Sequence, residues 1–106
     1  MIGTKIKEKD IQHPCLFATP AYSIYVEDNT IGWMLHIYVR RWSVGIYKEL
    51  LGVMAMIVQS APRNEVYCFS DNSKLSKFAT MFGMEHVDDV IGKDGKPIGE
   101  LRCLTL

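Results

Sequence analysis

The sequence predicts a single α+β domain over residues 1–106, with the element order β-β-α-β-α-β-β. Two segments, 45–60 and 71–84, carry apolar residues at helical spacing, whereas 21–27 and 31–40 alternate in the manner of strands. A length of 106 residues suffices for one hydrophobic core without disulfide or metal support.

A hairpin is expected near the start of the domain. Apolar and polar side chains alternate over 21–27, and Asp28-Asn29 favours a turn before a second strand over 31–40. Residues 1–20 fit no single pattern because two prolines interrupt them. Within that stretch, 15–18 is suited to a short strand at a sheet edge.

The remaining elements alternate between helix and strand. A broad apolar stripe predicts a helix over 45–60, and the short apolar run 65–70 is typical of an interior strand. Residues 71–84 combine capping side chains, apolar helical spacing and a glycine suited to a left-handed C-terminal cap. The chain closes with a predicted hairpin, whose strands and turn are 85–91, 98–106 and Asp94-Gly95.

Amino-acid composition limits the binding partners and the cellular compartment that we expect for this protein. Twelve basic residues balance twelve acidic residues, so no net field would attract nucleic acid or an anionic membrane. The three cysteines are widely spaced and odd in number, which favours a reducing compartment. The charged N-terminus is unlike a signal peptide, and the longest apolar run, around 50–58, is shorter than a membrane span. We therefore expect a cytoplasmic protein that binds neither nucleic acid nor membrane.

Several common site chemistries have no support. His13 and Cys15 are close in sequence, but no second pair at ligand spacing accompanies them, so we expect no metal. Cys68 lies in a strand predicted to be buried and lacks the electropositive, exposed setting of a nucleophile. The sequence contains no nucleophile elbow, complete P-loop or dinucleotide fingerprint.

Asn72 stands eleven residues before Gly83-Met84. This spacing and the order of elements resemble the GNAT superfamily of N-acyltransferases, from about Tyr22 to Leu106. The resemblance implies a mixed central sheet flanked by two main helices, with acetyl-CoA or coenzyme A as cofactor and an amine as acceptor. The chain is also similar to small GNAT-like proteins, some of them phage-encoded, because 1–20 is too short for the usual first strand and helical pair.

The resemblance further implies a pyrophosphate-binding loop at the start of the first helix, where backbone N–H groups and the helix dipole favour anions. Aligning the family's first glycine with Gly45 puts Trp42 where a basic or amide residue is usual. It also puts Tyr47 where a small residue lets phosphate approach the backbone. The implied cofactor-binding residues are Val39, Arg41, Val44, Gly45, Ile46, Tyr47, Lys48 and Asn72.

Many family members place a tyrosine four residues before the closing glycine to protonate the leaving thiolate, and here that position is Ala79. His36 and Tyr38 are the candidate catalytic residues that remain. They share one face of the strand before the loop, and histidine titrates near neutral pH. Each also has an ordinary alternative, since strand histidines and tyrosines usually serve packing.

Two hypotheses follow. The first is an acyl-CoA-dependent N-acetyltransferase that acts on an amine. The second is a non-catalytic GNAT-like scaffold or protein-interaction module that has lost acetyl-CoA chemistry. In either case a homodimer is expected, because so short a domain exposes apolar strand edges that pairing would cover.

Overall fold

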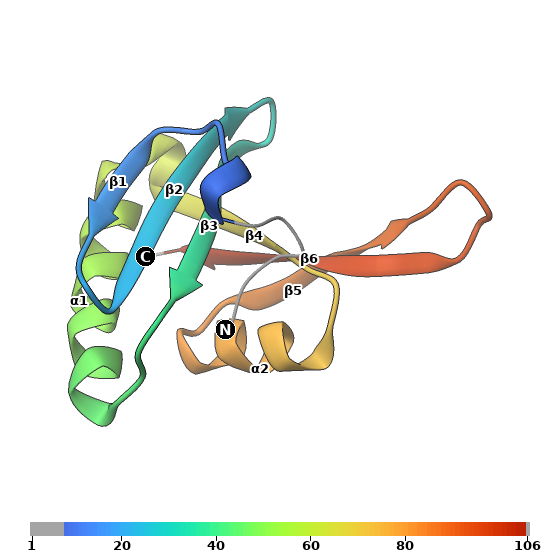
Figure 1. The fold of residues 1–106 in the computed structure, drawn as a ribbon. Coiled ribbons are helices and arrows are strands. Elements are labelled where there is room, and N and C mark those ends of the chain that lie inside the picture. The colour runs from blue at the N-terminus through green and yellow to red at the C-terminus, as the bar shows by residue number, and fades with distance from the viewer. Residues whose placement is uncertain (1–7, 106) are drawn as a thin grey trace.

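The computed structural model describes residues 8–105 of the chain and contains a mixed six-stranded sheet and two α-helices (Figure 1). The predicted α+β class is therefore confirmed. The elements in chain order are η1 (Glu8–Asp10), β1 (Cys15–Ala18), β2 (Tyr22–Asn29), β3 (Gly32–Val39), α1 (Val44–Ser60), η2 (Pro62–Asn64), β4 (Glu65–Ser70), α2 (Ser73–Met81), β5 (Glu85–Ile91) and β6 (Pro97–Thr105).

The strands follow the order β1-β2-β3-β4-β6-β5 across the sheet. β3 and β4 are parallel, and the other neighbouring pairs are antiparallel. The predicted hairpin of β2 and β3 is confirmed, with Tyr25 opposite His36 and Glu27 opposite Met34. β1 lies at one edge, as its short apolar sequence predicts. The predicted last strand extends to Leu106, which lies outside the described residues.

Both helices contribute to one apolar core. α1 connects β3 to β4 and α2 connects β4 to β5, and the two strands of each pair run in the same direction. Successive right-handed crossovers that advance in one direction along a sheet place their helices on the same face. The core joins side chains of β2, β3 and β4 to those of the helices, among them Ile24, Leu35, Leu50, Val66 and Phe78. Each such fully buried side chain stabilises the fold by about 1.5–3 kcal/mol.

The two helix ends that border the candidate site have defined caps. Asn72 is the N-cap of α2, and its Oδ1 accepts a 2.8 Å hydrogen bond from the N–H of Leu75. Gly83 has a φ of 80°, and the N–H of Met84 donates to the carbonyl of Ala79. This is a Schellman ending, which confirms the predicted glycine cap.

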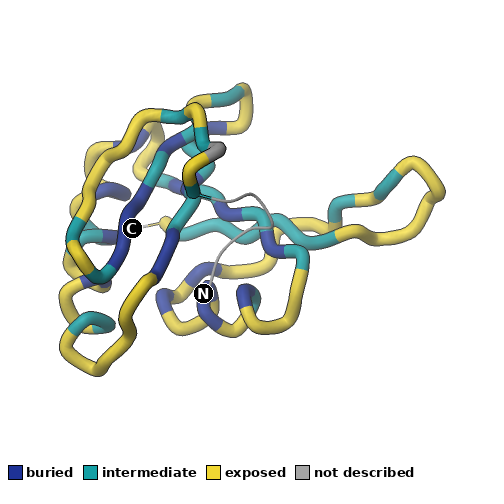
Figure 2. Tube along the Cα trace, viewed as in Figure 1, coloured by how far each residue is buried: buried dark blue, intermediate teal, exposed yellow. Residues whose placement is uncertain are grey.

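The β5–β6 hairpin projects from the body of the molecule (Figure 2). β6 pairs with β4 only up to Glu100, so the segment from Pro97 to Gly99 pairs with β5 alone. Ile91 and Ile98 on this projecting part are each 54% exposed. None of the helices between residues 8 and 105 is long and apolar enough to cross a bilayer.

Candidate functional site

The candidate site is the gap that opens between β3 and β4. These parallel strands pair only at Trp33–Val66 and Met34–Tyr67, and then they diverge toward their carboxyl ends (Figure 1). Ligands of sheets with parallel strands usually bind beyond carboxyl ends where the chain connections separate. The gap is therefore the place to look for a cofactor.

The loop that leads into α1 is organised by Ser43. Its hydroxyl oxygen accepts a 3.1 Å hydrogen bond from the N–H of Ile46, so the chain itself satisfies one of the free N–H groups of the first turn. Val44 and Gly45 are exposed, and so are Arg41 and Lys48. Two exposed cationic side chains, Arg41 and Lys48, therefore lie close in sequence to the start of α1.

Aromatic side chains of α2 line the gap, and two rings near the start of α1 pack against them. The ring centroids of Phe78 and Phe82 are 4.9 Å apart, those of Tyr47 and Phe82 are 5.3 Å apart, and those of Trp42 and Phe78 are 5.6 Å apart. The cavity that remains beside these rings measures about 20 Å³ and is lined by apolar residues that include Leu35 and Cys68. A volume of this size holds about one water molecule.

Tyr47 also closes the gap by a hydrogen bond. Its hydroxyl donates to the carbonyl oxygen of Met81 over 2.8 Å and thereby joins the first turn of α1 to the last turn of α2. Where the family's phosphate-binding loop has a small residue, this chain therefore has a tyrosine whose side chain reaches α2.

Asn72 lies at the other end of α2 from this contact. Nine helical residues separate it from the C-cap, Phe82, which corresponds to about 14 Å along the axis. Its Oδ1 is engaged in the helix cap, and its Nδ2 donates to Asp71 over 2.9 Å. The structure therefore gives Asn72 a capping role and does not bring it to Tyr47.

The two candidate catalytic residues lie on the opposite face of the sheet. Leu35 and Ile37 line the gap, so the alternating residues His36 and Tyr38 point away from it. Tyr38 is fully buried, and its ring meets the ring of Tyr25 edge-on at 6.0 Å. The sheet therefore separates both candidates from the implied cofactor-binding residues.

Val39 and Arg40 close β3 with structural contacts. Val39 is 5% exposed and belongs to the core, whereas Ile46 is half-buried and packs against it. The guanidinium of Arg40 donates 2.7 Å hydrogen bonds to Glu8, to the carbonyl of Thr19 and to the Ser23 hydroxyl. Arg40 therefore holds the N-terminal segment against the sheet rather than facing the loop.

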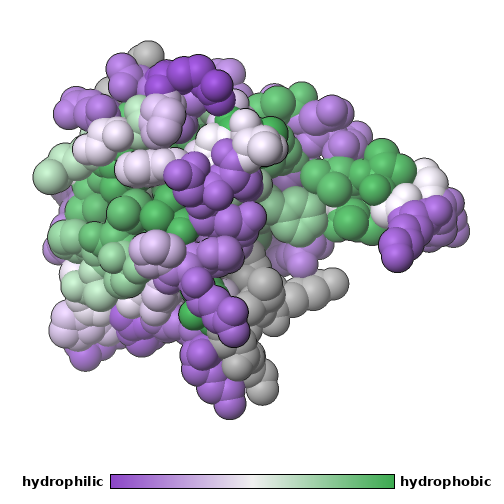
Figure 3. Space-filling view, turned by 90° about the horizontal axis from the view of Figure 1, so that it is seen from above, coloured by the Kyte–Doolittle hydropathy of each residue, from purple (hydrophilic) through white to green (hydrophobic). Residues whose placement is uncertain are grey.

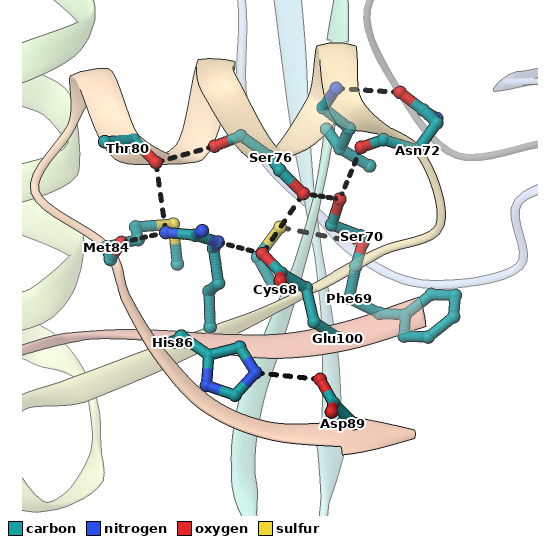
Figure 4. A network of polar contacts seen from close by, with 12 residues as sticks. Cys68, Phe69, Ser70, Asn72, Ser76, Thr80, Met84, His86, Asp89 and Glu100 are labelled. Atoms are coloured by element: carbon teal, nitrogen blue, oxygen red, sulfur yellow. Dashed lines mark hydrogen bonds and ion pairs between the residues drawn. The ribbon is translucent and has the colours of Figure 1, made fainter. Parts of the chain in front are cut away.

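A polar network joins α2 to β6 (Figure 4). The Ser76 hydroxyl lies 2.7 Å from that of Ser70 and donates to Glu100 over 3.1 Å. Arg102 donates to Glu100, and also to Thr80 Oγ1 and the Met84 carbonyl over 3.0 and 2.9 Å. The Arg102 hydrogen bond holds the pKa of Glu100 below its usual range. These contacts hold α2 against the sheet. They also explain why polar side chains lie on the side of this helix that faces β6.

A second polar cluster lies on the face that carries His36. Nε2 of His36 is 3.2 Å from Oε1 of Glu27, and Nε2 of His13 is 3.4 Å from the same oxygen. Sequence reasoning paired His13 only with Cys15 and missed this group. The hairpin register is the signal that would have found it, since Glu27 and His36 are diagonal neighbours on one face of β2 and β3.

Together these features define an α+β protein with a mixed sheet, a filled apolar gap between its parallel strands and a separate histidine–glutamate cluster. Comparison with protein-family models, with curated proteins and with solved structures finds no match to this chain.

Proposed function

We propose that this chain is a non-catalytic GNAT-like interaction module that associates with a second copy of itself. The filled gap between β3 and β4 is the main support for the first part of the proposal, that the chain is not a catalyst. The rings of Phe78 and Phe82 line it, Tyr47 of α1 packs edge-on against Phe82, and about 20 Å³ remains in the cavity. Filling this space stabilises the core and leaves no path for an acyl-pantetheine chain.

The placement of the other candidate residues supports the same proposal. Asn72 caps α2, and Tyr38 is buried on the far face of the sheet. Cys68 is buried as well, and that burial raises its pKa to about 11, so its thiol is a poor nucleophile at neutral pH. An acyl transfer needs an acceptor, an acid or base and a thioester within reach of one another.

The self-association part is supported by edge strand β1. Its four residues are exposed and uncharged, and they include Leu16 and Phe17, which are 38% and 39% exposed. The opposite edge, β5, carries Glu85, Asp88 and Asp89, and charges of one sign disfavour pairing with a copy of itself. β1 is therefore the edge suited to an isologous contact.

The surface beside β1 is apolar as well. Leu16 and Phe17 line a groove of about 230 Å³ together with α1 residues that include Val53, Met56 and Ile57. Figure 3 shows hydrophobic surface on the side of the molecule where β1 and α1 lie. Antiparallel pairing of two β1 strands would extend the sheet and cover both copies of this groove.

Calorimetric titration with acetyl-CoA and with free coenzyme A tests the first part of the proposal. We expect no binding heat at millimolar ligand. Micromolar binding would contradict it and favour the second candidate, an acyl-CoA-dependent N-acyltransferase. That candidate is supported by the divergence of β3 and β4 after two pairs and by the cations Arg41 and Lys48 near the start of α1.

Sedimentation equilibrium tests the second part. We expect a dimer at tens of micromolar protein and at least a tenfold weaker dimer in Phe17→Lys, because a lysine there would be buried without a partner charge. Ile31→Lys is the matched control, since Ile31 is 40% exposed and lies in the β2–β3 turn. A wild-type protein that is monomeric at about 100 micromolar, or equal effects of both substitutions, would overturn the dimer.

A further inference from the structure

The His13–Glu27–His36 cluster has the composition of a metal site. Two imidazole nitrogens and one carboxylate oxygen lie within 4.8 Å of one another. Two histidines and one carboxylate are a common ligand set for divalent first-row transition ions, with the remaining positions open to water. The residues come from the segment before β1, from β2 and from β3, so the fold assembles the set from distant parts of the sequence.

The distances are those expected between two ligand atoms of one metal ion. A tetrahedral zinc ion with bonds of about 2.0–2.1 Å places its ligand atoms about 3.3 Å apart. The two imidazole nitrogens of His13 and His36 lie 3.4 and 3.2 Å from Oε1 of Glu27. Both distances agree with the edge of such a tetrahedron, and the His36 contact is also within hydrogen-bonding range.

The carboxylate is oriented for this role. Nδ2 of Asn29 donates to Oε2 of Glu27 over 3.3 Å, which leaves Oε1 facing the two imidazoles. A partner that orients a ligand from behind is usual in metal sites.

The ring of His36 is held in place with Nε2 toward Glu27. Its side chain is 11% exposed, and its Nδ1 is buried without a hydrogen-bond partner among residues 8–105. In the tautomer that carries its proton on Nε2, this nitrogen donates to Glu27, whereas in the other tautomer its lone pair faces the carboxylate. A cation between the two groups would select the second tautomer and replace the hydrogen bond by coordination. His13 and Glu27 are 38% and 37% exposed, which leaves the cluster open to solvent and to an entering ion.

We propose that His13, Glu27 and His36 bind one divalent transition-metal ion, with zinc as the first ion to test. The bound ion would tie the segment before β1 to the β2–β3 hairpin and complete its coordination with water. This inference is independent of coenzyme A binding, because the cluster lies on the opposite face of the sheet from the filled gap.

A second cluster supplies a matched control. His86, Asp89 and Glu100 also lie within 4.8 Å of one another, but Glu100 is already engaged by Arg102 and Ser76 (Figure 4). His86 and Asp89 are exposed and hydrogen-bonded to each other over 2.9 Å. We therefore expect His86→Gln to bind zinc as the wild-type protein does.

The test is calorimetric titration of the chelator-treated full chain with zinc chloride, repeated with cobalt chloride and visible absorption. We expect one ion per chain with micromolar or tighter affinity, and cobalt bands typical of a tetrahedral or five-coordinate site. His13→Gln and Glu27→Gln should each weaken binding at least a hundredfold, and Asn29→Ala about tenfold. Cys15→Ser should leave the affinity unchanged, which separates the cluster from the nearby exposed thiol.

Thermal unfolding gives a second readout. A hundredfold excess of zinc over its Kd should raise the Tm of the wild-type protein by about 10 °C and that of Glu27→Gln by much less. Circular dichroism of each variant without metal establishes that it is folded. Absence of binding at millimolar zinc would overturn the proposal. Equal affinity in Glu27→Gln and wild type, or loss of binding in His86→Gln or Cys15→Ser alone, would overturn it too.

Discussion

The hydroxyl of Tyr47 and the backbone carbonyl of Met81 are joined by a 2.8 Å hydrogen bond, although 34 residues separate them in the chain. This contact holds the start of α1 against the end of α2 across the gap between β3 and β4. The same ring packs edge-on against Phe82. One side chain therefore both fills the candidate site and connects the two helices that border it.

Replacing Tyr47 should separate these two roles. Tyr47→Phe keeps the ring and loses one hydrogen bond, so we expect it to lower the free energy of unfolding by about 1 kcal/mol. Tyr47→Ala also removes a half-buried ring, and we expect a loss of about 2–3 kcal/mol in urea denaturation. Lys48→Ala, an exposed neighbour, should change stability by less than about 0.5 kcal/mol. Equal stability of Tyr47→Ala and wild type would show that the ring does not close the gap.

Asn72 is predicted to act on stability rather than on ligand binding. Asn72→Ala removes the acceptor for the N–H of Leu75 and should cost about 1 kcal/mol, whereas Asn72→Asp keeps an acceptor and should be nearly neutral. Ser73→Ala, at the next position, is the control. A stability loss in Asn72→Ala that was measured only in the presence of coenzyme A would be inconsistent with a cap, because a cap acts without ligand.

The thiols of Cys15 and Cys68 should differ sharply in reactivity. Cys15 is exposed, whereas Cys68 is 8% exposed and burial raises its pKa to about 11. We expect a thiol reagent at pH 8 to modify Cys15 within minutes in the native protein and Cys68 only after unfolding. Mass spectrometry of digested protein assigns the sites. Early modification of Cys68 would mean that the gap between β3 and β4 opens readily.

Glu100 should contribute to the loss of stability in acid. Its pKa is lowered in the folded state, chiefly by the Arg102 hydrogen bond, so it binds a proton less readily there than in the unfolded chain. Its contribution is present above the unfolded pKa of about 4.3 and disappears as the pH falls through the lower folded pKa. Glu100→Gln should cost about 1–3 kcal/mol at pH 7 and flatten the stability profile between about pH 5 and 3. An unchanged slope in urea denaturation across that range would refute this role.

Local sequence determined most of the secondary structure. The apolar spacing over 45–60 and 71–84 marks α1 and α2, and the cap Asn72 and the glycine Gly83 mark the ends of α2. Alternation predicts β2 and β3, and the turn chemistry of Asp94-Gly95 predicts the last hairpin. These features depend on neighbours within a few residues, so a single sequence carries them. The α+β class and the edge position of β1 are predicted from the same local patterns.

Only the tertiary structure decided what the candidate residues do. The sequence places Tyr47 in a loop position, but its contact with Met81 depends on how two helices cross the sheet. His36 was a candidate base, and its partners Glu27 and His13 come from other strands and segments. Such contacts are set by strand order, register and packing between distant parts of the chain. Sequence spacing therefore identified the elements, whereas packing determined that the gap is filled and that two histidines share one carboxylate.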